Sequence, residues 1–147
     1  MKENYNPKGI GEKSEAQILA ALLKADKVVL LPFGDNQRYD MVVHEAGEFF
    51  RIQCKTARKR DGYIEFATCS TNWNSGKSFT YEGEIDFFAA YVREDDKVYF
   101  IPISETSKRS CRLRLEPAKN NQKKRTRDAC DYLFTIDKDL KKYCARS

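Results

Sequence analysis

Two β-rich segments separated by a short polar connection constrain the fold of this chain most. Residues 39–43 are largely apolar and β-branched, and residues 48–54 alternate between apolar and polar side chains. The connection between them, His44-Glu45-Ala46-Gly47, is polar and ends in glycine. This pattern is typical of a β-hairpin with a tight turn. We therefore expect a hairpin over residues 39–56, and its register decides which side chains meet.

Asp40 and Gln53 occupy opposed positions in this hairpin when the turn is centred between Ala46 and Gly47. Directly opposed residues of an antiparallel pair share a face, with Cβ atoms roughly 5 Å apart. Lys55 lies two residues beyond Gln53 and returns to that face, because strand side chains alternate. A carboxylate, a carboxamide and an ammonium group then converge on one face. A shift of the register by one residue would separate them.

A helix over residues 8–25 is predicted to precede the hairpin. Ser14 and Gln17 resemble a capping box near its start. Glu15 shares one helical face with three apolar side chains, those of Ile18, Leu19 and Leu22. A carboxylate on an apolar face is costly without a cation or metal partner, which favours a functional role for Glu15. The alternative is a surface acid placed favourably in the first helical turn.

The rest of the pattern predicts a mixed, largely antiparallel β-sheet flanked by helices, an α/β (α+β) layer fold. Strands are expected at residues 27–31, 63–68, 85–92, 97–103 and 112–115, loops at residues 32–38, 69–83 and 116–127, and weaker helices at residues 128–134 and 137–145. A chain of 147 residues is long enough to bury a core of its own. We therefore expect a single domain over residues 1–147.

Composition and cysteine usage exclude several classes of protein. No apolar stretch approaches the 18 or so residues of a transmembrane helix, and the N-terminus lacks the apolar region of a signal peptide, so no membrane partner is expected. The five cysteines are an odd number and include no CxxC pair. This argues for reduced thiols in a cytoplasmic protein, and against a disulfide framework or a structural zinc site.

Positive charge is concentrated in two segments, although the net charge of the whole chain is only +5. Residues 51–60 hold five bases and no acid, and residues 108–127 hold nine bases and one acid, so the rest of the chain is net acidic. A single basic run is usually a solvated face. Two such runs in an otherwise acidic chain favour a polyanion-binding surface, and we expect nucleic acid as the partner.

Three groups of polar and basic residues are the candidate DNA contacts. Arg58, Lys59 and Arg60 continue directly from the hairpin strand and should follow the phosphate backbone. Asn72, Trp73, Asn74 and Lys77 lie in the polar loop. The third group comprises Arg112, Arg114, Lys119, Asn120, Asn121, Gln122, Lys123, Lys124, Arg125 and Arg127. Its Asn and Gln side chains suit adenine, and its Arg side chains suit guanine or phosphate.

The order Glu15, Asp40, Gln53-Cys54-Lys55 on helix, strand and strand resembles the PD-(D/E)XK nuclease superfamily. The basic stretch that begins at Arg112, with Asp131-Tyr132 after it, is similar to the group I intron-encoded homing endonucleases of that superfamily found in cyanobacteria. The resemblance covers most of the chain. It implies a restriction-endonuclease-like core, site-specific cleavage of double-stranded DNA and a 5′-phosphate product.

The resemblance also implies a role for each residue of the motif. Mg²⁺ would be held by Asp40, by the Gln53 side-chain oxygen and by the Cys54 backbone carbonyl, and Glu15 would position a second metal or the attacking water. Lys55 would orient the water or stabilise the transition state. Gln53 departs from the family pattern, which has Asp or Glu there, and a carboxamide oxygen ligates Mg²⁺ without contributing charge.

A chain of this size should assemble symmetrically to cut both strands, and the resemblance favours a tetramer over a dimer. Three alternatives stay open at this point. Two are nucleases of the same fold, a Holliday-junction resolvase and a restriction endonuclease. The third is a non-catalytic DNA-binding protein in which Gln53 marks a decayed site.

Overall fold

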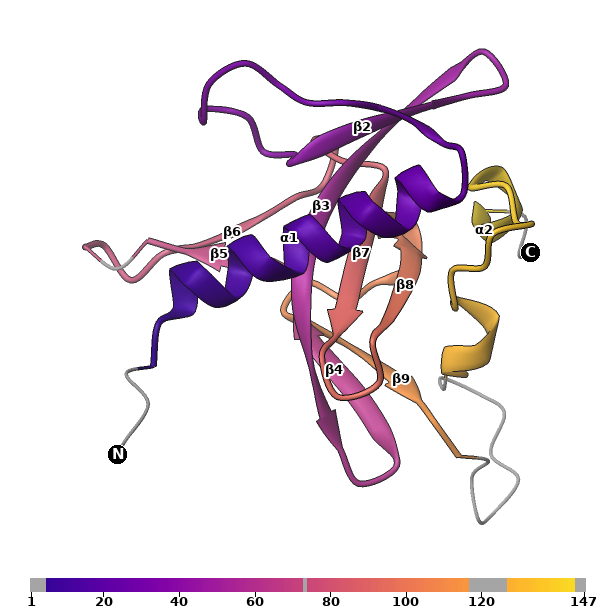
Figure 1. The fold of residues 1–147 in the computed structure, drawn as a ribbon. Helices are drawn as coiled ribbons and strands as arrows, with labels where there is room; N and C mark the ends of the chain where they lie inside the picture. The colour runs from indigo at the N-terminus through magenta and orange to yellow at the C-terminus, as the bar shows by residue number, and fades with distance from the viewer. Residues whose placement is uncertain (1–4, 73, 117–126, 145–147) are drawn as a thin grey trace.

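The computed structural model describes residues 5–72, 74–116 and 127–144, and it contains a seven-stranded sheet and a separate two-stranded sheet. Along the chain the elements are α1 (Pro7–Lys24), β1 (Val28–Leu30), β2 (Met41–Glu45), β3 (Glu48–Arg60), β4 (Tyr63–Ala67), β5 (Cys69–Thr71), β6 (Ser78–Thr80), β7 (Phe87–Val92), β8 (Lys97–Pro102), the 3₁₀ turn η1 (Ile103–Glu105), β9 (Ser110–Arg114), the 3₁₀ turn η2 (Ala129–Asp131) and α2 (Lys141–Cys144). Figure 1 shows α1 crossing in front of β3 and β7, with β4 and β9 projecting beyond it.

The 13-residue strand β3 organises the large sheet. Its first part pairs antiparallel with β2, its middle pairs parallel with β7, and its last residues pair antiparallel with β4. The other pairs of the large sheet, β1 with β2, β7 with β8 and β4 with β9, are also antiparallel. The predicted mixed, largely antiparallel sheet is therefore confirmed for the described residues. The predicted strands at residues 27–31, 63–68, 85–92, 97–103 and 112–115 correspond to β1, β4, β7, β8 and β9.

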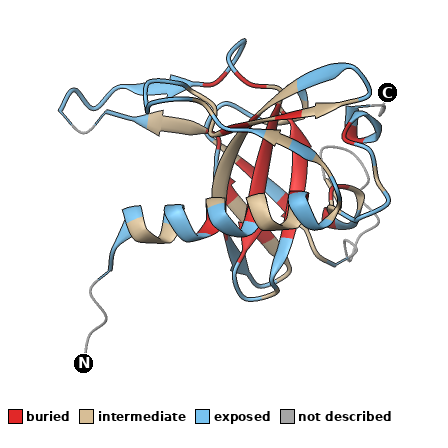
Figure 2. Ribbon diagram, turned by 45° about the horizontal axis from the view of Figure 1, so that its top comes forward, coloured by how far each residue is buried: buried red, intermediate tan, exposed pale blue. Residues whose placement is uncertain are grey.

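Two hydrophobic cores lie on opposite faces of β3. Ile18 and Leu22 of α1 pack with Ile52 on one face, which we call the helix face. Residues of β4, β7, β8 and β9 enclose the second core on the opposite face, and Ala57 belongs to it. Because strand side chains alternate, Cys54 and Thr56 point to the helix face. Gln53 and Lys55 point to the opposite face, and the strands between the two cores are the most buried part of the molecule (Figure 2).

The start of α1 differs from the sequence-based expectation. Asn6 is the N-cap, its side chain accepts a hydrogen bond from the Gly9 amide at 3.1 Å, and Pro7 occupies the first helical turn. Asn followed by Pro favours the start of a helix. The Asn side chain accepts a hydrogen bond from an otherwise unpaired backbone amide, and Pro has no backbone N–H that would need a partner. The predicted capping box was wrong, since its Ser14 is a buried residue in the middle of the helix.

Two further expectations are corrected. The predicted loop at residues 69–83 contains the β5–β6 hairpin, whose Ser- and Thr-rich strands lack apolar alternation. The predicted helices at residues 128–134 and 137–145 are reduced to η2 and the four-residue α2. The Phe100 amide donates a hydrogen bond to the Tyr132 carbonyl at 2.8 Å, so the first of these two segments pairs with β8 and does not form a longer helix. No helix among the described residues is long and apolar enough to cross a membrane.

Candidate active site

The β2–β3 hairpin turns through two residues in the left-handed conformation, Ala46 with φ 52° and Gly47 with φ 77°. A two-residue turn of this kind matches the twist of the flanking strands and fixes the register. Met41 pairs with Ile52, and Glu45 pairs with Glu48. Beyond Met41 the register shifts by one residue, because the Asp40 amide donates at 2.8 Å to the carbonyl of Ile52, which is already the partner of Met41. The centre of the turn is therefore as predicted, but the predicted opposition of Asp40 and Gln53 was wrong: Asp40 and Met41 both lie opposite Ile52, as in a β-bulge.

The Asp40 carboxylate is anchored to the edge of β3 at the point where β2 begins. Its Oδ2 accepts a hydrogen bond from the backbone amide of Cys54 at 2.9 Å. The amide and carbonyl of one strand residue point to the same side. The Cys54 carbonyl therefore faces the same open edge as the Asp40 carboxylate, and the two oxygens are candidates for holding one cation.

The Gln53 side chain bonds to the residues that lead into β2. Its amide nitrogen donates to the Arg38 carbonyl at 2.7 Å and lies 3.3 Å from Asp40 Oδ2. The opposite orientation of the carboxamide would place its oxygen against acceptors only, so the hydrogen bonds select this one. In this arrangement Gln53 is therefore a donor to Asp40, and its oxygen is directed elsewhere.

Lys55 projects from the same face as Gln53 and reaches Tyr81. Its Nζ lies 3.3 Å from the Tyr81 hydroxyl and 4.9 Å from the centre of that ring. The other approach to the ring is made by Arg38, whose guanidinium carbon lies 3.9 Å from the ring centre. Tyr81 itself is only 4% exposed. A buried aromatic ring thus contacts two cations, one of them the lysine of the motif.

Glu15 approaches the site from the helix face. Burial raises the pKa of this carboxyl, and the nearby charges of Asp40 and Glu12 raise it further. Burial also raises the pKa of Asp40, although the Cys54 amide and Lys55 act in the opposite direction. The pKa of the Cys54 thiol is raised well above its ordinary value by burial and by both carboxylates. Glu15 and Asp40 therefore act on each other electrostatically.

A short contact beside Glu15 fixes α1 to β3. The hydroxyls of Ser14 and Thr56 lie 2.6 Å apart, and Ser14 is 1% exposed. Thr56 is on the helix face, one residue beyond Lys55. This contact sets the height and rotation of the helical turn that carries Glu15.

The donor set fits a divalent cation of the magnesium type. The described residues contain no cluster of three or more His, Cys, Asp or Glu side chains that could hold a metal. Mg²⁺ does not need one, because it is commonly held by one or two carboxylates together with waters and substrate phosphates. Asp40 and Glu15 supply two carboxylates, and burial raises the pKa of each. A bound cation would favour their ionised forms.

The expected DNA contacts of β3 divide between its two faces. Arg58 and Arg60 follow Thr56 on the helix face, whereas Lys59 points away and pairs with Asp95 at 2.8 Å. Among the described residues, neither Arg58 nor Arg60 has a carboxylate within 4 Å. Three consecutive basic residues in a strand cannot share one surface, because successive side chains alternate.

The other expected DNA contacts are placed as follows. Arg112 pairs with Glu65 and lies over the Tyr63 ring, and Arg114 pairs with Asp128 at 2.9 Å. Asn72, Asn74 and Lys77 lie at the tip of the β5–β6 hairpin, and all three are exposed. Arg127 is partly exposed, and its carbonyl accepts from the Arg114 amide at 2.7 Å. Trp73, Lys119, Asn120, Asn121, Gln122, Lys123, Lys124 and Arg125 lie outside the described residues.

Sequence reasoning missed three residues of this region. Arg38 and Tyr81 lie in segments without a motif, and only the fold brings Tyr81 to Lys55 and Arg38 to the Tyr81 ring. Arg109 lies with Arg58 and Arg60 along a groove of about 310 Å³ on the helix side of β3, β4 and β9. Arg109 lies in the basic segment 108–127, which indicated a polyanion-binding role in general, but the sequence did not predict on which face of the sheet Arg109 lies.

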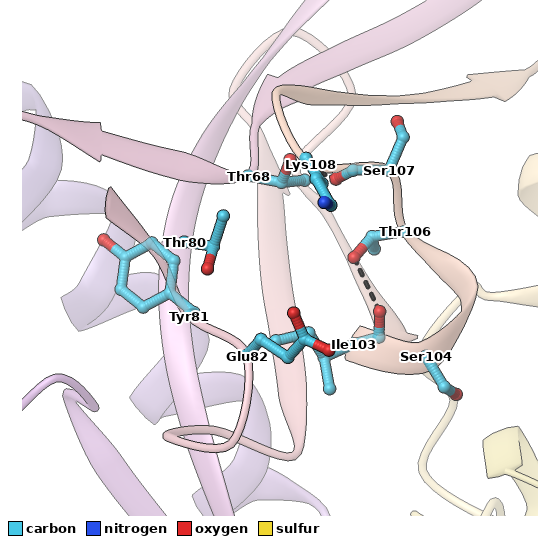
Figure 3. Close-up of a pocket in the computed structure, with 9 residues that line it drawn as sticks. All are labelled: Thr68, Thr80, Tyr81, Glu82, Ile103, Ser104, Thr106, Ser107 and Lys108. Carbon is cyan, nitrogen blue, oxygen red and sulfur yellow. Dashed lines mark hydrogen bonds between the residues drawn. The ribbon is translucent and has the colours of Figure 1, made fainter. Parts of the chain in front are cut away.

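A separate cavity of about 360 Å³ lies beside Tyr81. Figure 3 shows the Tyr81 hydroxyl pointing away from the other side chains that line it. Two of the cavity hydroxyls are already bonded to backbone carbonyls, Thr68 to Ser107 at 2.6 Å and Thr106 to Ile103 at 2.8 Å. Tyr81 therefore separates this cavity from Lys55, and we do not include it in the candidate site.

Comparisons with known proteins identify the family and the fold of this chain. A sequence profile described as PD-(D/E)XK endonuclease matches residues 5–135, which include all four residues of the motif. Among solved structures, the bacterial homing endonuclease I-Ssp6803I is similar to this chain, with a TM-score of 0.64 and 22% sequence identity over 88% of each chain. Identity at that level shows a shared restriction-endonuclease-like fold. The search of curated proteins gave no match.

Proposed function

The chain belongs to the PD-(D/E)XK endonuclease family, and on that basis we propose that it is a Mg²⁺-dependent, site-specific endonuclease of double-stranded DNA. We propose further that it is a homing endonuclease of the group I intron-encoded type, with one nuclease domain over residues 1–147. A solved structure similar to this chain is described as a homing endonuclease, which supports that choice. The five free thiols are consistent with a proposed cytoplasmic location.

The observation that carries the proposal is the meeting of four side chains at one edge of β3. Asp40 lies at the open edge, Gln53 and Lys55 lie on one face, and Glu15 arrives from the other. These residues come from a helix, the residue preceding β2, and β3. A chance surface cluster would not explain a half-buried carboxylate bonded to the backbone beside a second carboxylate.

Each residue has a defined role in the proposed reaction. Asp40, the Gln53 oxygen after rotation of its carboxamide, the Cys54 carbonyl and Glu15 would hold the cation. When bound, Mg²⁺ supplies Lewis-acid polarisation of the phosphate and lowers the pKa of water. Lys55 places positive charge where negative charge develops on the scissile phosphate.

A basic surface beside the site supports DNA as the substrate. Arg58, Arg60 and Arg109 line the groove on the helix side of the sheet, beyond Thr56. We propose that these three residues contact the phosphates that flank the scissile bond, and that Lys59 contributes less because it pairs with Asp95. We propose additional contacts from the exposed tip of the β5–β6 hairpin and from the basic segment that begins at Arg112.

An uncovered apolar surface supports a homo-oligomer. Val28 lies opposite His44, His44 is stacked on Phe49 at 4.4 Å, and Leu30 follows Val28 on the same face of the edge strand β1. Val28, Leu30 and Phe49 are all exposed. An open strand edge with apolar side chains is a favourable place for a second copy to pair. Cleaving both DNA strands needs two active centres, so we propose a symmetric assembly, with a tetramer favoured over a dimer.

A non-catalytic DNA-binding protein is the second candidate, because Gln53 donates to Asp40 and adds no negative charge. A cleavage-selection experiment distinguishes the nuclease from the non-catalytic DNA-binding protein.

The protein and an Asp40→Ala variant would be incubated with a sequence-randomised duplex library and with a four-way junction, each with Mg²⁺ and with EDTA. Mg²⁺-dependent cutting of selected duplexes by the native protein alone is the expected result. Cutting confined to the junction would indicate a resolvase, and binding without cutting would favour the non-catalytic candidate.

A further inference from the structure

The Tyr81 hydroxyl is the only hydrogen-bond partner of the Lys55 ammonium among the described residues. Tyr81 is a rigid partner, because it is almost fully buried and its ring meets Phe88 edge to face, with centroids 5.5 Å apart. A lysine side chain has four rotatable bonds and loses conformational entropy when it is fixed. Contact with a fixed hydroxyl and an aromatic ring confines the Lys55 ammonium before any substrate arrives.

Arg38 connects this pair to two other parts of the molecule. Its side chain donates to Glu84 at 2.7 Å, to the Ser70 hydroxyl at 2.9 Å and to the Thr80 carbonyl at 3.0 Å. The guanidinium therefore lies between the β5–β6 hairpin and the Tyr81 ring. The backbone carbonyl of the same residue accepts from Gln53 at 2.7 Å. One residue thus contacts the ring that holds Lys55 and the side chain next to Asp40.

We propose that Tyr81 is a positioning residue for Lys55 and that Arg38 holds Tyr81 in the orientation this requires. We assign Tyr81 no contact with the scissile phosphate or with a metal ion, and it acts only through the lysine. The inference deepens the proposed nuclease function and rests on it for its consequence in catalysis. The contact itself can be tested without DNA.

The first test measures how accessible the Lys55 amine is in the free protein. Reductive methylation with formaldehyde would be followed residue by residue by peptide mass spectrometry, in EDTA. Lys55 should be methylated at least threefold faster in Tyr81→Phe than in the native protein, because the variant keeps the ring and loses only the hydroxyl. Tyr91→Phe is the matched control, since Tyr91 is similarly buried, packs in the core on the helix face, opposite to the face of Lys55, and donates its hydroxyl to Asp96 at 2.7 Å.

The second test measures single-turnover cleavage of a duplex that the native protein cuts. Tyr81→Phe should lower the rate constant about tenfold while the Kd for the same duplex in EDTA changes less than twofold. Arg38→Lys keeps the positive charge but loses the planar guanidinium group with its several N–H donors, and it should give an intermediate rate constant. Tyr91→Phe should cleave at the native rate. Circular dichroism melting of each variant checks that the fold is retained.

The outcomes separate the inference from the proposed function. Faster methylation and slower cleavage in Tyr81→Phe would support the inference. Native methylation of Lys55 in a folded Tyr81→Phe protein would overturn it, whether or not DNA is cut. Native cleavage by Tyr81→Phe would overturn it as well. If the native protein cuts no DNA, the proposed function fails, and the methylation result still decides whether Tyr81 holds Lys55.

Discussion

The backbone amide of Cys54 donates to Asp40 Oδ2 at 2.9 Å, so the central carboxylate is held by the strand that carries Gln53 and Lys55. This contact exists because β2 begins only at Met41 and leaves the edge of β3 open beyond Ile52. The carboxylate takes the place that another strand residue would occupy. Any substitution that keeps a hydrogen-bond acceptor at position 40 should preserve the bond to the Cys54 amide. Such a substitution can therefore test the role of Asp40 in cleavage without changing the fold.

Asp40→Asn should abolish cleavage but preserve the fold, because the Asn oxygen can still accept from Cys54. The pKa of Asp40 is raised by burial, so the folded protein binds a proton more readily than the unfolded chain. The free energy of unfolding contributed by this group therefore falls as pH rises from the ordinary Asp range, near 3.9, through the raised value. The variant should melt at a higher temperature than the native protein at pH 8, with a smaller difference at pH 4. Melting curves at the two pH values measure this, and an equal difference at both would contradict it.

Gln53→Glu should bind Mg²⁺ more tightly and lower the stability of the metal-free protein by about 1–3 kcal/mol. The new carboxylate lies beside Asp40 and can no longer donate to the Arg38 carbonyl, which leaves a polar group unsatisfied. Calorimetric titration with Mg²⁺ and melting in EDTA measure the two effects. Gln122→Glu is the matched control, because it makes the same chemical change outside the motif. Unchanged Mg²⁺ affinity would show that Gln53 is not a ligand.

Ser14→Ala should destabilise the protein by about 1–3 kcal/mol, because it removes the partner of the Thr56 hydroxyl in a nearly buried contact. The turn that carries Glu15 should also become less fixed, so the affinity for Mg²⁺ should fall. Denaturant unfolding and Mg²⁺ titration measure both quantities. Ser104→Ala, at an exposed position, is the control for the loss of a serine hydroxyl. Loss of stability with native Mg²⁺ affinity would confine the contact to a structural role.

Arg58→Ala with Arg60→Ala should reduce the salt dependence of DNA binding. Each phosphate contact contributes about 0.9 to the slope of log K against log salt concentration, so the double variant should lose about 2 from it. Lys59→Ala should change the slope less, because Lys59 points to the other face and pairs with Asp95. Fluorescence anisotropy in EDTA at several salt concentrations provides the comparison. Equal changes for both proteins would contradict the assignment of faces.

Phe49→Thr with Leu30→Thr should shift the protein to a smaller assembly. Both side chains are exposed on the uncovered apolar surface beside the β1 edge. Light scattering coupled to size-exclusion chromatography measures the mass in solution. Ile136→Thr is the control, because Ile136 is similarly exposed but lies in a different part of the chain. A native mass for the double variant would place the interface elsewhere.

The hairpin and its register could be predicted from the sequence, since alternation and a turn ending in glycine act between residues close in the chain. The same holds for the long leading helix and for the buried strand at residues 85–92, where the apolar pattern is continuous. The hairpin brings Asp40 to the end of the ladder, where its carboxylate lies beside Gln53 and the Cys54 amide, and alternation returns Lys55 to the face of Gln53. The motif that indicates the family is therefore a local property of the sequence.

Only the tertiary structure decided what surrounds the motif. Tyr81 reaches Lys55 and the Arg38 guanidinium because the chain returns to the sheet after the β5–β6 hairpin, and no local sequence pattern predicts that return. The segment at residues 128–134 pairs with β8 because β8 offers it backbone partners, which outweigh its weak helical preference. Alternation also divides Arg58, Lys59 and Arg60 between two faces of β3. Only the packing of α1 against part of the sheet decides which of these faces is open to a partner. Contacts between residues distant in sequence depend on the whole packing, and local patterns do not encode them.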